Sequence, residues 1–167
     1  EERVNISALR HVIDHKRSVI LGDPGSGKST FLNYLTWCLA GARLYPDRGY
    51  LDRLNVVRED GHRAATWRAT VTLPVRVDLR ELAQDITEDA KRGSADMLWK
   101  HIVRQLTEHQ VGEFAPDLQA ALHAGKALVM LDGLDEVPDK SRRQIVRQAV
   151  SDFADTYDDS HFAVTCR

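Results

Sequence analysis

The sequence predicts an α/β fold with a doubly wound parallel sheet. Short apolar segments alternate along the chain with segments whose apolar residues recur at helical spacing, and a parallel sheet requires this order of elements. Residues 127–131 are apolar throughout, as expected for a strand that is buried on both faces of such a sheet. A glycine-containing loop also separates the first expected strand from the helix that follows it.

Two units are expected at the start of the chain. Residues 1–16 predict a leading helix with its apolar face formed by every third or fourth residue, and either Asn5 or Ser7 would be its N-cap. Residues 17–41 predict a strand, a loop and a helix in succession, and Gly41 is the expected helix stop.

The middle of the chain is less regular. Residues 43–70 show no clear period and could hold a short helix. Residues 71–79 alternate apolar and polar side chains, which predicts a strand. Pro74 lacks an N–H, so this strand should lie at a sheet edge or begin just after the proline. Helical spacing then predicts helices over residues 98–109 and 114–124.

The last third predicts a strand, a helix and a final strand. The apolar strand 127–131 comes first. Ser141 and Gln144 fit a capping box, which predicts that the next helix begins there. Residues 162–165 predict a strand at the end of the chain.

Composition excludes several classes of protein. The 167 residues carry a net charge of −2, and 43% of them are hydrophobic, which is globular rather than disordered composition. The near-neutral charge gives no reason to expect direct nucleic-acid binding. No apolar run is long enough to span a membrane. Two cysteines do not make a disulfide framework, so we expect a reducing, cytoplasmic setting.

The loop after the first strand matches the phosphate-binding pattern G-x-x-x-x-G-K-[ST]. Gly25 and Gly27 permit the backbone angles that turn successive N–H groups toward an anion. Lys28 would reach the β- and γ-phosphates of a nucleotide, and the Ser29 hydroxyl would bind Mg²⁺. A chance match is the alternative, but the position between a strand and a helix argues against it. The predicted nucleotide-binding residues are Gly22, Asp23, Pro24, Gly25, Ser26, Gly27, Lys28, Ser29 and Thr30.

A second motif follows the apolar strand 127–131. Asp132 stands at its carboxyl end, which is expected beside the phosphate loop, and would hold Mg²⁺ in the Walker B role. A second carboxylate nearby could orient or deprotonate an attacking water. Asp135 and Glu136 are both candidates for this catalytic role. The alternative for either residue is that it caps or charges the next helix.

Together, the segments 22–30 (GDPGSGKST) and 131–136 (LDGLDE) resemble a NACHT domain. NACHT domains belong to the STAND class of signalling ATPases, which includes NOD-like receptors and bacterial antiphage relatives. The small Gly133 after the metal-binding aspartate, with an acid three positions beyond that aspartate, is the variant of Walker B that distinguishes the family. Residues 73–82 resemble its second strand, and residues 163–167 resemble its sensor strand, which ends in arginine.

The resemblance implies a P-loop NTPase sheet with strand order 5-1-4-3-2 and the strand of Pro74 at one edge. It implies that Arg167 senses the γ-phosphate. The chain is expected to stop after the sensor strand, with the family's helical arm and winged-helix domain lying beyond it. The implied nucleotide-binding core spans residues 1–167, with a leading helix (1–16), a P-loop unit (17–41), a Walker B segment (127–138) and the sensor strand (161–167).

The function implied is an ATP/ADP switch that needs Mg²⁺ and hydrolyses ATP slowly, as the core of a larger signalling or antiphage-defence receptor. Its partners would be the nucleotide and, on activation, other copies of itself, joined through regions outside this chain. One alternative is an oligomerisation scaffold that binds nucleotide without turnover. A small-molecule kinase is disfavoured, because the chain shows no arginine-rich lid and the pattern of Gly133 and Asp135 is foreign to kinases.

Overall fold

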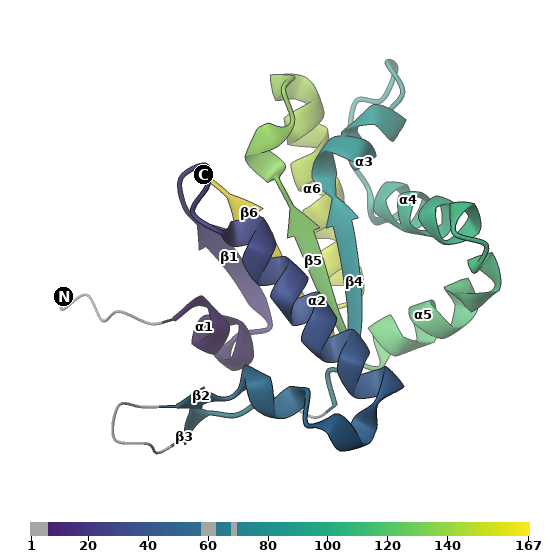
Figure 1. Cartoon of the computed structure of the whole chain (residues 1–167). Helices are drawn as coiled ribbons and strands as arrows, with labels where there is room; N and C mark the ends of the chain where they lie inside the picture. Colours follow the sequence, from purple (N-terminus) through teal and green to yellow (C-terminus); the bar gives the residue numbers. More distant parts are fainter. Residues whose placement is uncertain (1–6, 58–62, 68–69) are drawn as a thin grey trace.

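The protein, described by a computed structural model over residues 7–57, 63–67 and 70–167, is built on a four-stranded parallel sheet (Figure 1). The α/β fold class is therefore confirmed. Helices cover both faces of the sheet. The strands of the sheet are β1 (Arg17–Leu21), β4 (Leu73–Asp78), β5 (Ala127–Asp132) and β6 (His161–Cys166), in the order β1-β6-β5-β4.

The predicted strand order 5-1-4-3-2 is not observed. Numbered along the chain within the sheet, the strands lie in the order 1-4-3-2, and no fifth strand pairs with β1 in the described part of the chain. β1 therefore lies at an edge of the sheet among the described residues, where the predicted order placed it inside the sheet. Pro74 lies inside β4, which among the described strands pairs with β5 alone. The predicted edge position is confirmed, and the alternative start after the proline is wrong.

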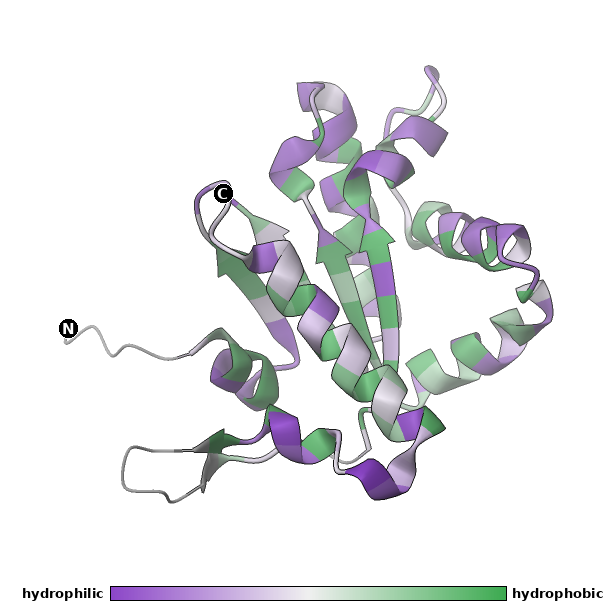
Figure 2. Ribbon diagram, viewed as in Figure 1, coloured by the Kyte–Doolittle hydropathy of each residue, from purple (hydrophilic) through white to green (hydrophobic). Residues whose placement is uncertain are grey.

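The core has two halves, one on each face of the sheet. Leu128 and Met130 of β5 pack in the same cluster as α1 and α2. Val129 and Leu131 belong to the opposite cluster, with α3 to α6. All of β5 is buried, as the apolar run over residues 127–131 predicts for most of its length. Figure 2 shows hydrophobic residues in green along the central strands. The helices are α1 (Ala8–Asp14), α2 (Lys28–Leu44), α3 (Leu79–Asp85), α4 (Ala95–Glu108), α5 (Ala115–His123) and α6 (Lys140–Thr156).

Helix α2 does not end at Gly41, as predicted, but continues to Leu44. Gly41 is buried and faces the ring of Tyr50, where an added Cβ would lie 2.5 Å from the nearest ring carbon. The glycine at this position therefore makes room for a packed aromatic ring inside the helix. Pro46, two residues beyond the last helical residue, begins a separate 3₁₀ turn.

Two helix caps were predicted, with different outcomes. Ser7 caps α1, because its side chain accepts a backbone N–H bond of 3.2 Å, whereas Asn5 and Ile6 lie outside the described residues. The predicted capping box at Ser141 is wrong. Asp139 is the cap of α6 and accepts a backbone N–H bond of 2.7 Å, so Ser141 lies inside the first turn.

The sequence did not predict helix α3 or most of the structure in the segment 43–70. β4 ends at Asp78, whose side chain caps α3 by accepting the N–H of Arg80 at 2.8 Å. The predicted strand 71–79 is therefore too long at both ends. The segment 43–70 contains short 3₁₀ turns and a small antiparallel ribbon. Its described elements are η1 (Pro46–Arg48), η2 (Leu51–Leu54), β2 (Val56–Val57) and β3 (Arg63–Ala65).

None of the helices in the described ranges is both long and apolar enough to cross a membrane.

Candidate functional site

A cavity of about 250 Å³ lies where the loop after β1 meets the loop after β5. The first loop and the start of α2 contribute residues 24–30, β6 contributes Thr165, and Arg167 follows β6. The end of β5 contributes Asp132, and the loop after it contributes Gly133, Asp135 and Glu136. The structure therefore brings both predicted motifs and the predicted sensor arginine to one site. Gly22 and Asp23 are the predicted residues that do not line it.

The backbone of the first loop is shaped by two glycines. Gly25 and Gly27 have φ angles of 78° and 88°, in the left-handed region where glycine is favoured. Gly27 directly precedes α2, and no side chain caps the N-terminus of this helix. The uncapped helix end presents backbone N–H groups and the positive end of its dipole, which together favour an anion.

The Lys28 side chain folds back over its own loop. Its Nζ donates to the backbone carbonyl of Gly22 and, at 3.0 Å, to the carbonyl of Asp23. Both acceptors are neutral oxygens. A phosphate placed at the helix end would make stronger, charge-assisted bonds with the same ammonium. Gly22 and Asp23 thus contribute to the site through the position of Lys28.

Asp132 closes β5 and is 8% exposed. Thr165 Oγ1 donates to Oδ1 at 2.6 Å, and Arg76 Nη2 donates to Oδ2 at 2.9 Å. Burial by itself opposes ionisation of this carboxyl. Hydrogen bonds from Thr165, Arg76 and Ser29 outweigh it and hold the pKa of Asp132 below its usual value. Asp132 is therefore a carboxylate at neutral pH, as a metal ligand must be.

Sequence reasoning assigned no role to Thr165 or Arg76. Thr165 is fully buried, and its Oγ1 also accepts the N–H of Gly133 at 2.8 Å, so it holds the start of the loop after β5. Arg76 extends from β4, and its Nη1 donates to Asn33 Oδ1 on α2 at 2.5 Å. Neither strand is marked by its sequence as part of the site, because β4 also contains Asp78 and β6 also contains His161.

The two candidate catalytic acids lie in a 3₁₀ turn, η4 (Leu134–Glu136), which follows Gly133. Arg167 Nε lies 2.8 Å from Asp135 Oδ2, and Arg80 Nη1 lies 3.1 Å from Glu136 Oε2. Neither acid caps α6, whose cap is Asp139, and both acids lie in the first turn of η4. Each acid at this end of β5 forms an ion pair with an arginine from elsewhere in the chain. We call these the three acid–arginine pairs: Asp132–Arg76, Asp135–Arg167 and Glu136–Arg80.

Two side chains of this cavity could serve as ligands of a Mg²⁺ ion that takes its other ligands from phosphate and water. Within residues 7–57, 63–67 and 70–167, no group of three or more His, Cys, Asp or Glu side chains could hold a metal ion by itself. Ser29 and Asp132, which line the same cavity, offer one hydroxyl and one carboxylate. Mg²⁺ in proteins commonly uses such a small donor set and takes its other ligands from phosphate and water.

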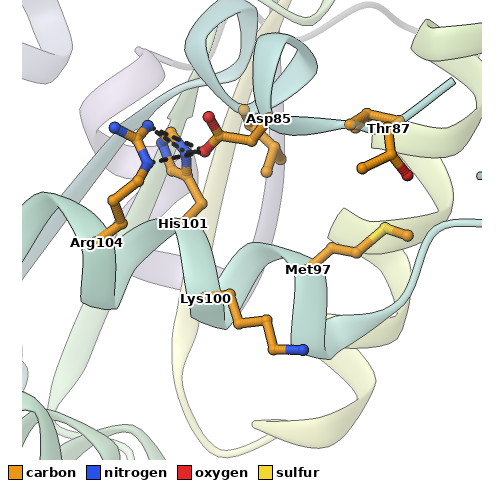
Figure 3. Close-up of a pocket in the computed structure, with 8 residues that line it drawn as sticks. Asp85, Thr87, Met97, Lys100, His101 and Arg104 are labelled. Atoms are coloured by element: carbon orange, nitrogen blue, oxygen red, sulfur yellow. Dashed lines mark hydrogen bonds and ion pairs between the residues drawn. The ribbon is translucent and has the colours of Figure 1, made fainter.

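A second pocket, of about 300 Å³, lies between α3 and α4 and contains none of the predicted site residues (Figure 3). Asp85 accepts hydrogen bonds there from His101 Nδ1 at 2.6 Å and from Arg104 Nη2 at 2.9 Å. The other ring nitrogen of His101 is buried and has no hydrogen-bond partner among the described residues. The apolar part of the lining is formed by Leu82, Ile86 and Met97, and no glycine-containing loop is among the residues that line this pocket.

Comparison with known proteins found no match to this chain among family models, curated proteins or solved structures.

Proposed function

We propose that this chain binds ATP and ADP together with Mg²⁺ and hydrolyses ATP slowly. The observation that carries the proposal is the cavity of about 250 Å³ shared by the phosphate-loop residues, Asp132 and Arg167. These residues come from three separate segments, and each supplies the group that nucleotide chemistry needs at that place. The uncapped start of α2 supports the same conclusion, because it favours a phosphate without any further side chain.

Each residue has a defined part in this proposal. Lys28 and the loop N–H groups hold the phosphates, and Ser29 and Asp132 hold the metal ion. When bound, Mg²⁺ would neutralise charge on the phosphate oxygens. Asp135 orients the attacking water and accepts its proton, and Glu136 is the other candidate for that task. Arg167 donates to the terminal phosphate that distinguishes ATP from ADP.

We further propose that the chain is the NACHT-like, P-loop NTPase core of a larger STAND signalling or antiphage-defence receptor that acts in the cytoplasm. The support is the pair of motifs quoted above, with Gly133 and Asp135 in the family's arrangement. The sensing and effector parts, and the contacts through which copies would assemble, would then lie outside this chain.

Binding without turnover is the second candidate function. It is favoured by the pairing of both catalytic candidates, since Asp135 contacts Arg167 and Glu136 contacts Arg80. A carboxylate whose oxygen is already engaged by a guanidinium is less available to orient a water molecule. Single-turnover hydrolysis of radiolabelled ATP separates the two candidates: release of phosphate supports the slow ATPase, and its absence supports the scaffold.

The binding proposal is tested by calorimetry with MgATP. We expect Lys28→Ala to abolish measurable binding while circular dichroism shows an unchanged fold, because the ammonium contacts loop carbonyls rather than the core. Lys100→Ala is the matched control, since Lys100 is exposed on α4 and forms an ion pair with Asp96. Equal ATP affinity in the Lys28 variant and the unaltered chain would reject the phosphate-loop assignment. We expect GTP to compete poorly, since the sequence has no guanine-binding N-K-x-D motif.

A further inference from the structure

Arg76 contacts the proposed metal ligand, although nothing in the proposed reaction requires an arginine there. We propose that Arg76 is a positioning residue that occupies the Asp132 carboxylate in the metal-free protein and thereby raises the Mg²⁺ concentration that tight ATP binding requires. This inference rests on the proposed nucleotide-binding function. It assigns control of Mg²⁺ binding to a residue that lies outside both sequence motifs.

Both carboxylate oxygens of Asp132 are engaged in the structure. Oδ1 accepts from Thr165 at 2.6 Å, and Oδ2 accepts from Arg76 at 2.9 Å. Ser29, the other proposed metal ligand, lines the same cavity as this carboxylate. The carboxylate of Asp132 is therefore occupied by two neighbouring donors, and Arg76 must withdraw before Oδ2 can accept a metal ion or a metal-bound water.

Arg76 is the donor that can leave. Thr165 is fully buried in β6 and is fixed by a second bond to the N–H of Gly133. The Arg76 side chain is 38% exposed and extends from the edge strand β4. Its other contact is with Asn33, an exposed residue on α2. A long, partly solvated side chain on a sheet edge can change rotamer without disturbing the core, whereas a buried threonine cannot.

The positive charge of Arg76, like its position, opposes the binding of Mg²⁺ to Asp132. A guanidinium within hydrogen-bond distance of a carboxylate opposes the approach of a divalent cation to that carboxylate. A partly exposed, charge-assisted pair is weaker than a buried one because solvent screens it, so we expect its removal to lower the Mg²⁺ requirement by about 3- to 10-fold.

The test compares Arg76→Gln with the unaltered chain in ATP titrations at a series of MgCl₂ concentrations and in excess EDTA. We expect the half-saturating Mg²⁺ concentration to fall by about 3- to 10-fold in Arg76→Gln, while ATP affinity in EDTA stays the same. Arg17→Gln is the matched control. Arg17 also lies on a strand and pairs with an aspartate, Asp155, at 2.8 Å, but it sits at the amino end of β1, away from the phosphate loop.

A second variant guards against misfolding of the first. Arg76→Lys keeps the charge but cannot donate to Asn33 and Asp132 with a planar fork, so we expect an intermediate Mg²⁺ requirement. An unchanged or higher requirement in a folded variant that still binds ATP would overturn the role of Arg76 and leave the nucleotide site intact. Failure of the unaltered chain to bind ATP in a Mg²⁺-dependent manner would overturn the proposed function and this inference together.

Discussion

Arg167 and Asp135 form an ion pair across the candidate site, with 2.8 Å between Nε and Oδ2. The Asp135 side chain is 14% exposed and that of Arg167 is 62% exposed, so the arginine is the partner with room to move. In the proposed function these two residues are the γ-phosphate sensor and the water-orienting acid. Movement of Arg167 to a terminal phosphate would release Asp135. Recognition of ATP would then free the acid that is proposed to orient the attacking water.

Arg167→Ala is expected to weaken ATP binding about 10- to 150-fold and to leave ADP affinity nearly unchanged. The reason is that charge-assisted hydrogen bonds to the terminal phosphate are worth roughly 1.5–3 kcal/mol, and ADP lacks the oxygens that accept them. Calorimetric titration with both nucleotides measures the difference. Equal losses for ATP and ADP, or no loss for either, would reject the sensor role.

Asp135→Asn is expected to slow hydrolysis by about 10²- to 10⁴-fold while changing ATP affinity little, because the amide keeps the shape of the side chain and removes the base. Asp132→Asn should behave differently and weaken binding only when Mg²⁺ is present. Single-turnover rates and affinities with and without Mg²⁺ distinguish the two effects. If Glu136→Gln alone causes the hydrolysis defect, the catalytic acid is Glu136.

Thr165→Val is expected to lower the free energy of unfolding by about 1–3 kcal/mol, because the buried N–H of Gly133 loses its acceptor and Asp132 loses a donor. Urea denaturation followed by circular dichroism measures this loss. Thr36→Val on α2 is a suitable control, since the Thr36 hydroxyl bonds mainly to its own helix. If Thr165→Val lowers the free energy of unfolding no more than Thr36→Val does, the two hydrogen bonds of Thr165 contribute little to stability.

Asp85→Asn is expected to destabilise the protein at pH 7 by about 1–2 kcal/mol and progressively less as the pH falls below about 4. Burial raises the pKa of Asp85, but hydrogen bonds from His101 and Arg104 outweigh it, so the pKa in the folded state is lowered. A lowered pKa stabilises the fold above the unfolded-state value and ceases to do so as the pH falls through the folded-state value.

Thermal melts of the Asp85 variant at pH 7 and at low pH measure this difference. Asp96→Asn is the control, since the Asp96 side chain is 63% exposed in an ion pair within α4. A constant difference in Tm between the Asp85 variant and the unaltered chain across this pH range would contradict the stabilising role of the ionised Asp85 carboxylate.

The parts of the fold that the sequence predicted well are those with a strong local pattern. The apolar run of β5 and the phosphate loop could be located because each signal lies within a few consecutive residues. Helix α3 was missed because Leu79 continues the alternation of β4, while Asp78 acts as a cap rather than as a strand residue. The end of α2 was missed because Gly41 is explained by packing against Tyr50, which a local pattern does not contain.

In the site, too, residues marked by a local pattern could be predicted and residues placed by strand pairing could not. Asp132 could be predicted from its place after an apolar strand. Arg76 could not, because its contact depends on the register that pairs Asp78 with Asp132 and so places Arg76 on the same face, two residues earlier. Thr165 likewise depends on β6 lying next to β5. Residues whose role arises from pairing between distant strands leave no local signature.

The three acid–arginine pairs have a consequence for how the site responds to ionic strength. The side chains of Asp132 and Asp135 are 11% and 14% exposed, whereas that of Glu136 is 45% exposed. Dissolved ions screen exposed charges strongly and sheltered charges much less. Added salt should therefore loosen Glu136 from Arg80 first, while β4 and β6 stay tethered to the end of β5 through the other two pairs.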